Sequence, residues 1–160
     1  GNYPVRRDAM YLDEVAEEVV RAARVLASTR NVAIDFHTIQ PAPFTGDEDL
    51  IRRLIGNLLD NAVRHTPPGA AVRVDLQHAV GGYNLQVNDS GPGVPPDSQP
   101  HIFERFYRAD TSRSRNPPDA GAGLGLALAR WIARVHGGDV VLVHTSSAGS
   151  TFAVTLPHGG

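Results

Sequence analysis

The chain has 160 residues, of which 41% are hydrophobic and 20% are charged, with a formal net charge of −2. This length and composition are typical of one globular domain and argue against a fibrous or disordered chain. The small negative net charge argues against a strongly basic nucleic-acid binder or membrane-surface binder. No apolar run approaches the roughly 18 residues that a membrane-spanning helix needs.

Two residue types are missing: the chain has no cysteine, and its 15 positively charged side chains are all arginine. Disulfides, thiolate nucleophiles and Cys-based zinc sites are therefore excluded. Without lysine, a Walker A phosphate loop and Schiff-base chemistry are excluded as well. Because the chain starts at Gly1 and not at a Met, we expect a piece of a longer protein, with residues 1–160 forming a single domain and residues 1–4 partly derived from cloning.

The first half of the chain predicts two helices and a strand. Apolar residues recur at helical spacing over about 11–28, and residues 32–36 alternate as in a strand. The stretch 40–46 is rich in turn-forming residues. Thr45 and Glu48 fit a capping box, which predicts a second helix from about residue 46 to His65, before two prolines.

The second half predicts two hairpins and a third helix. Residues 72–77 and 83–88 alternate around a Gly-Gly pair, and residues 140–143 and 151–156 form a second such pair of strands. Between them, residues 89–121 hold six of the twelve prolines and form a long, functional or mobile loop. A helix follows from just after Gly123 to about His136. This order predicts an α/β two-layer sandwich, in which three helices cover one face of a mixed, largely antiparallel sheet.

The second predicted helix carries Asn57 and Asn61 one turn apart, on one face. A solvated helix face is the simpler interpretation. However, asparagine is a poor helix former. Amide oxygens also suit Mg²⁺ that keeps phosphate and water ligands.

Asp89-Ser90-Gly91-Pro92-Gly93 directly follows a predicted strand. These residue types are typical of a surface turn. The functional interpretation places the Asp89 carboxylate at the strand end, where it accepts a hydrogen bond from an exocyclic amine. The glycines then allow the backbone to approach a flat ring.

Gly121-Ala122-Gly123-Leu124-Gly125-Leu126 leads into the third helix. A hinge or close helix packing explains the glycines, but glycines before a helix also free backbone N–H groups for a phosphate. A dinucleotide fingerprint fits poorly, because no strand immediately precedes the motif. Nearby, Phe103-Glu104-Arg105-Phe106-Tyr107-Arg108 is either an apolar anchor or part of an arginine-rich phosphate site. The seven histidines show no metal-ligand spacing, and no serine lies in a nucleophile elbow.

Together these motifs resemble, in order, the four sequence boxes of sensor histidine kinases. The N box is matched by residues 57–66, the G1 box by 89–94, the F box by 102–108 and the G2 box by 121–128. The chain is similar to the catalytic and ATP-binding domain of a bacterial two-component sensor histidine kinase, in the Bergerat-type ATPase superfamily. The two-layer sandwich of that family agrees with the fold predicted from the elements.

The resemblance implies roles for the polar residues. Asn61 is expected to coordinate Mg²⁺, with Asn57 supporting it or positioning the phosphates. Asp89 is expected to accept the adenine amino proton. Arg64 stands where the family usually has a lysine near the phosphates, and His65 where the family often has an aromatic residue that contacts the nucleotide.

The remaining implied roles concern the loops. Arg108 is a candidate ligand of the γ-phosphate, and residues 109–122 are expected to be a lid that is mobile without nucleotide. Gly91 and Gly93 are expected to make room for the purine. The glycine-rich segment is expected to cradle the phosphates, through Gly121, Gly123, Leu124, Gly125 and Leu126.

The family's phospho-accepting histidine lies in a separate dimerisation domain, and no such box occurs here. The resemblance therefore implies that this chain binds Mg²⁺ and ATP but cannot autophosphorylate by itself. Its partners are ATP, the kinase's own dimerisation domain and, through the full-length protein, a response regulator receiver domain; no nucleic acid is expected. We expect a monomer from the isolated domain and a homodimer from the parent, with the domain in the cytoplasm below an inner-membrane anchor.

Three alternatives stay open. A Bergerat-type ATPase of the gyrase, chaperone or mismatch-repair kind usually has a carboxylate base where Asn57 stands, and an amide cannot serve as that base. A serine kinase that acts as an anti-sigma factor should lack the Phe103–Arg108 box. A module that binds nucleotide or a protein partner without transfer activity would need a binding assay to exclude.

Overall fold

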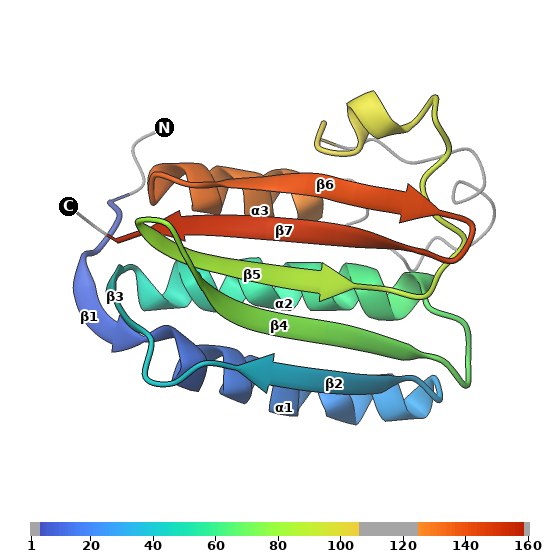
Figure 1. Ribbon diagram of the computed structural model, residues 1–160, viewed down its shortest axis with the longest axis horizontal. Coiled ribbons are helices and arrows are strands. Elements are labelled where there is room, and N and C mark those ends of the chain that lie inside the picture. Colours follow the sequence, from blue (N-terminus) through green and yellow to red (C-terminus); the bar gives the residue numbers. More distant parts are fainter. Residues whose placement is uncertain (1–3, 106–124, 159–160) are drawn as a thin grey trace.

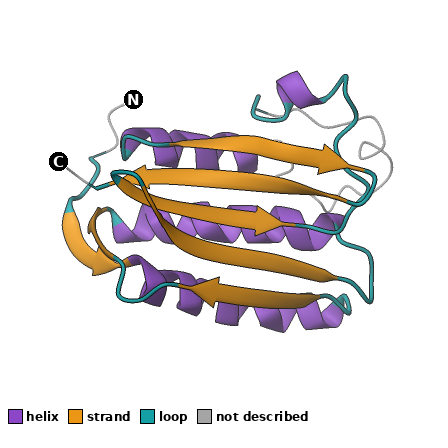
Figure 2. Cartoon of the chain, in the orientation of Figure 1, coloured by secondary structure: helices purple, strands orange, loops and turns teal. Residues whose placement is uncertain are grey.

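The computed structural model describes residues 4–105 and 125–158. A five-stranded sheet forms one layer and three helices form the other (Figures 1 and 2). The helices are α1 (Leu12–Thr29), α2 (Glu48–His65) and α3 (Gly125–Val135), with a short 3₁₀ turn at Gln99–His101. Within the described ranges, no helix is both long and apolar enough to cross a lipid bilayer.

The main sheet has the strand order β2-β4-β5-β7-β6. Its strands are β2 (Ala33–Thr38), β4 (Ala71–Ala79), β5 (Gly82–Asn88), β6 (Asp139–Ser146) and β7 (Gly149–Pro157). β2 and β4 are parallel, and the crossover that a parallel pair requires contains α2. The other three pairings are antiparallel. The predicted two-layer sandwich with a mixed, largely antiparallel sheet is thus confirmed.

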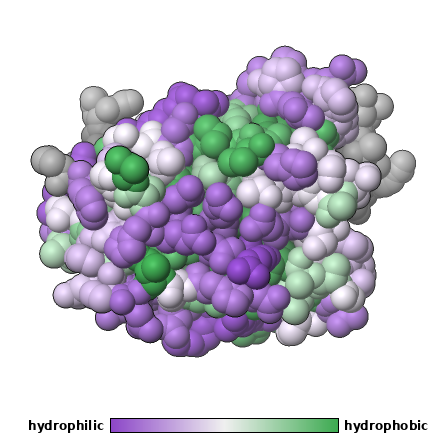
Figure 3. All heavy atoms as spheres, in the orientation of Figure 1, coloured by the Kyte–Doolittle hydropathy of each residue, from purple (hydrophilic) through white to green (hydrophobic). Residues whose placement is uncertain are grey.

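Strand alternation places the core between the two layers. On β4, Val72, Val74 and Leu76 face the helices and are buried, whereas Arg73 and Gln77 are exposed. This period of two is the pattern that a sheet with one solvated face requires. Seen from its open side the sheet is largely polar, apart from a hydrophobic patch over β6, where Val141 and Val143 are exposed (Figure 3).

The start of α2 corrects one sequence prediction. The cap is not Thr45: Asp47 precedes the helix, and its carboxylate accepts the Leu50 backbone N–H at 3.2 Å. Thr45 instead lies in β3 (Pro43–Gly46), which pairs with β1 (Asp8–Tyr11) in a small second sheet. The predicted turn-rich stretch 40–46 therefore contains a strand. Both strands have only four residues, too few for a periodic signal.

The small sheet gathers the N-terminal segment, α2 and α3 at one end of the molecule. The Arg6 backbone N–H donates to Asp47 Oδ2, and the Arg7 guanidinium donates to the carbonyl of Val135, the last residue of α3. A cation at this position satisfies an otherwise unpaired carbonyl and opposes the negative end of the helix dipole. The opposite end of the molecule carries the residues predicted to be functional.

Candidate functional site

The polar face of α2 carries four of the predicted residues. Asn57 and Asn61 are half-buried, and the Asn57 side-chain N–H donates to the backbone carbonyl of Gly125 at 3.2 Å. The structure therefore brings the predicted N-box residue against the first residue of α3. Among the described residues, the side-chain amide of Asn61 has no hydrogen-bond partner, so its oxygen is available to a ligand.

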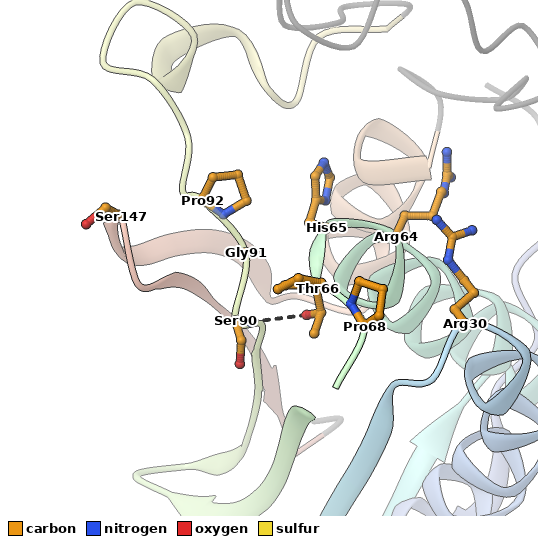
Figure 4. Close-up of a pocket in the computed structure, with 10 residues that line it drawn as sticks. Arg30, Arg64, His65, Thr66, Pro68, Ser90, Gly91, Pro92 and Ser147 are labelled. Carbon is orange, nitrogen blue, oxygen red and sulfur yellow. Dashed lines mark hydrogen bonds between the residues drawn. The ribbon is translucent and has the colours of Figure 1, made fainter. Parts of the chain in front are cut away.

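The last turn of α2 carries two basic residues, Arg64 and His65. The Arg64 guanidinium forms an ion pair with Asp60, one turn earlier, at 2.7 Å. The His65 ring contacts the backbone carbonyl of Asn61 through Nδ1 at 2.8 Å, which leaves Nε2 directed away from the helix backbone. Arg64 and His65 line a pocket of about 700 Å³, together with Arg30, Thr66, Pro67, Pro68, Ser90, Gly91, Pro92 and Ser147 (Figure 4).

Asp89 follows β5 directly and is buried. Its Oδ1 accepts two backbone N–H groups, from Gly91 at 2.9 Å and from Ser150 at 3.2 Å. Its Oδ2 has no hydrogen-bond partner among the described residues, although it is not sealed from solvent. One oxygen therefore fixes the carboxylate and the other is free to accept a hydrogen bond from a ligand.

The glycines after Asp89 have packing reasons of their own. A Cβ on Gly91 would lie 2.4 Å from the carbonyl oxygen of His65. A Cβ on Gly93, whose φ is +89°, would lie 2.2 Å from the carbonyl oxygen of Ser146. Both glycines let the loop pack tightly on α2 and on the β6–β7 turn. Their predicted contact with a purine stays a prediction.

The start of α3 lies against Asn57 of α2. Gly125 is its first residue, and half-buried Leu126 packs against the core. The first N–H groups of an α-helix have no partner within the helix, and its dipole favours an anion there. The predicted residues Gly121, Gly123, Leu124 and Arg108, with the proposed lid at 109–122, lie outside the described residues.

Two residues that hold Asp89 and its neighbour Ser90 in place were not predicted from the sequence. The Thr66 hydroxyl accepts the Ser90 backbone N–H (Figure 4). Ser150 on β7 supplies one of the two N–H groups on Asp89. Gly149 packs directly against the Asp89 backbone, because a Cβ there would lie 2.1 Å from the Asp89 carbonyl oxygen. Only the pairing of β5 with β7 brings Gly149 and Ser150 next to Asp89. The only sequence pattern that points to this region is the turn predicted at residues 146–149, which starts the strand that carries Ser150.

Among residues 4–105 and 125–158, no three His, Asp or Glu side chains are grouped to hold a metal ion. Mg²⁺ does not require such a group, because it usually keeps several waters and binds through one or two protein oxygens plus substrate phosphates. The amide oxygen of Asn61 fits that role.

The family described as histidine kinase-, DNA gyrase B- and HSP90-like ATPase matches residues 46–160. The chain belongs to this family.

Within this family, the chain is similar to sensor histidine kinases. The chain is 34% identical over 150 residues to the sensor-like histidine kinase SenX3 of Mycolicibacterium smegmatis, covering 94% of this chain and 38% of that protein. It is 37% identical over 158 residues to the probable sensor histidine kinase TcrY of Mycobacterium tuberculosis, covering 98% and 32%. The chain thus spans about a third of the length of these relatives.

Solved structures agree. The mycobacterial sensor histidine kinase MprB matches with a TM-score of 0.79 and 31% identity, covering 94% of this chain and 97% of that one. Full-length ShkA in complex with AMPPNP matches with a TM-score of 0.81 and 25% identity, covering 100% and 33%. The resemblance to sensor histidine kinase catalytic domains is therefore confirmed.

Proposed function

We propose that this chain binds Mg²⁺ and ATP between α2, the loop after β5 and the start of α3, and supplies the γ-phosphoryl group to a histidine on another domain of the full-length kinase. The observation that carries the proposal is the Asp89 carboxylate. Two backbone N–H groups hold one of its oxygens, and the other is open to an amine donor. An adenine amino group is such a donor.

The chemistry at Asn57 favours transfer over hydrolysis. Its side-chain N–H donates to the Gly125 carbonyl, and a carboxylate at this position would face that carbonyl oxygen with no proton to donate. An amide also cannot act as a general base that activates water. This supports a kinase over an ATPase of the gyrase or chaperone kind.

The residues of the chain then act by positioning and by charge. Asp89 orients the base, the start of α3 binds phosphate oxygens, and Arg64 adds positive charge at the end of α2. Asn61 would hold Mg²⁺, which neutralises phosphate charge when bound. In the transfer, the bond from the γ-phosphorus to its bridging oxygen breaks, a bond to the acceptor histidine nitrogen forms, and ADP leaves. Such reactions depend almost entirely on positioning and electrostatic stabilisation.

Calorimetric titration with ATP tests the binding step. We expect saturable binding in Mg²⁺ that weakens in EDTA. Asn61→Ala should lose most of this metal dependence, whereas Asn84→Ala, which removes an amide from β5, should keep it. No binding by the wild-type chain at millimolar ATP would contradict the proposal and favour an interaction module without nucleotide chemistry.

The transfer step has a separate test. Incubation of this chain with γ-labelled ATP should leave no acid-labile label on it. Adding a dimerisation domain of the parent kinase should place label on that domain. Acid-labile label on the chain alone would refute the proposed division of labour.

A further inference from the structure

His136 lies at the opposite end of α3 from the proposed phosphate site. It directly follows the helix, is buried with only 4% of its surface exposed, and belongs to none of the four sequence boxes. Its Nε2 accepts the Asp47 backbone N–H at 3.0 Å, and its Nδ1 contacts the Ile132 carbonyl oxygen at 2.8 Å. Because an N–H must meet an acceptor and a carbonyl must meet a donor, the ring is the neutral tautomer with its proton on Nδ1.

The ring is confined on its remaining sides. Phe44 packs against it with ring centroids 6.0 Å apart. Gly46 leaves room for it, because a Cβ there would lie 2.7 Å from the ring carbon Cδ2. The ring therefore has one position, and that position is tied to the residue that caps α2.

Two hydrogen bonds join the antiparallel helices α2 and α3, one near each end of α3. Asp47 bonds to His136, and Asn57 bonds to Gly125. Asp47 and Asn57 are ten positions apart and Gly125 and His136 eleven, which correspond to rises of about 15 Å and about 16 Å along a helix. The two spans match, so both bonds form at one axial position of α3, and a slide by one turn would break both.

Apolar packing alone specifies this position poorly. Two of the three fully buried side chains of α3 are alanines, Ala129 and Ala133, and the third is Ile132. Burial of apolar area is non-directional, whereas a hydrogen bond weakens steeply with misalignment. Directional contacts therefore select the axial position. The two bonds to α2 act together with the Arg7 bond to the Val135 carbonyl and with the ion pairs of Arg130 and Arg134 with Asp139.

From this geometry we infer that His136 is a positioning residue for the nucleotide site: its bond to Asp47 sets the axial position of α3 relative to α2, and thereby places the start of the helix against Asn57. This inference rests on the proposed function, because it assigns the start of α3 to phosphate binding. Roughly 16 Å along α3 separates His136 from Gly125, so any effect of His136 on nucleotide binding is transmitted through the packed helices and not by direct contact.

The test compares nucleotide affinity and local opening in matched variants. His136→Phe keeps a flat ring and removes both polar contacts. His136→Gln keeps an acceptor for the Asp47 N–H. Val20→Ala, at a fully buried position of α1, is the control for lost stability without a change at α3. All are titrated with Mg²⁺ and ATP at a temperature where each is folded by circular dichroism, so that a merely less stable fold leaves the measured Kd unchanged.

We expect His136→Phe to raise the Kd for ATP roughly tenfold, since small displacements of a positioning element have effects of this size or larger. His136→Gln should recover most of the affinity, and Val20→Ala should bind like the wild type. If His136→Phe does not fold, Gly46→Ala serves in its place, because the new methyl group displaces the ring while leaving the histidine present. A folded His136→Phe that binds like the wild type would overturn the inference.

Hydrogen exchange separates this inference from the proposed function. In His136→Phe, we expect faster exchange in α3, with protection in α1 and β4 unchanged. This readout needs no nucleotide, so it decides the point even if the wild-type chain binds no ATP. An equal loss of protection across α1, α3 and β4 would show that His136 only stabilises the fold, and would refute the positioning role.

Discussion

Asp89→Asn separates a role in recognising the base from a role in folding. The new side-chain oxygen can still accept the backbone N–H groups of Gly91 and Ser150, which the carboxylate accepts at 2.9 and 3.2 Å. The loop should therefore keep its conformation, with weaker bonds because charge-assisted hydrogen bonds are about twice as strong as neutral ones. We expect a loss of about 1–2 kcal/mol in the free energy of unfolding.

At the open side the substitution replaces an acceptor with a donor. An adenine amino group would then face an amide N–H, and the proposed bond to a charged acceptor would be lost. Such a bond contributes about 1.5–3 kcal/mol, which corresponds to roughly 10- to 150-fold weaker ATP binding. GTP presents a carbonyl at the same ring position, so its affinity should fall less or rise, and the preference for ATP over GTP should narrow.

Competition titrations with ATP and GTP measure both effects. The control is Asp13→Asn, because Asp13 is also a buried carboxylate that accepts a backbone N–H, from Ala42 at 2.9 Å, but lies away from the site. It should alter stability without changing the ratio of the two affinities. If folded Asp89→Asn binds ATP within about twofold of the wild type, the reasoning from the free oxygen is wrong.

Three further predictions concern stability. Gly93→Ala should lower the free energy of unfolding by at least about 1 kcal/mol, because φ is +89° and the methyl group would meet the Ser146 carbonyl oxygen. Urea denaturation should show this as a lower midpoint, and an unchanged midpoint would contradict it. Asp47→Ala should cost about 1 kcal/mol through loss of the α2 cap on Leu50, whereas Asp47→Asn should retain most of it in the same assay. Burial alone would raise the pKa of Asp47 and of Asp139, but hydrogen bonds and neighbouring arginines hold both pKa values below their ordinary range. Each carboxylate therefore stabilises the fold fully above the unfolded pKa of about 3.9, and this contribution is lost as the pH falls through the pKa of the folded state. The free energy of unfolding measured in urea should therefore drop below about pH 4. The drop should be less steep in Asp139→Asn, which cannot take up a proton at this position.

The helices and strands with long apolar repeats could be predicted from the periodicity of the sequence. The eight buried residues of α2, the alternation of β4 and β5, and the second hairpin all follow patterns that local geometry enforces. Termini were harder, as the cap of α2 shows. Thr45 has the right chemistry for a cap, but it lies in β3, where it pairs with Ala9 of β1. Asp47 therefore caps the helix.

By itself the sequence determined the class of fold and the family, and it named the candidate residues of the site, because apolar periodicity and motif spacing are local properties of the chain. It could not show that Ser150 and Gly149 hold Asp89, since these residues meet only when β5 pairs with β7. Nor could it show that Asn57 and His136 fasten the two ends of α3 to α2. Those contacts join residues far apart in the chain, and only the packing of the helix layer on the sheet brings their donors and acceptors within reach.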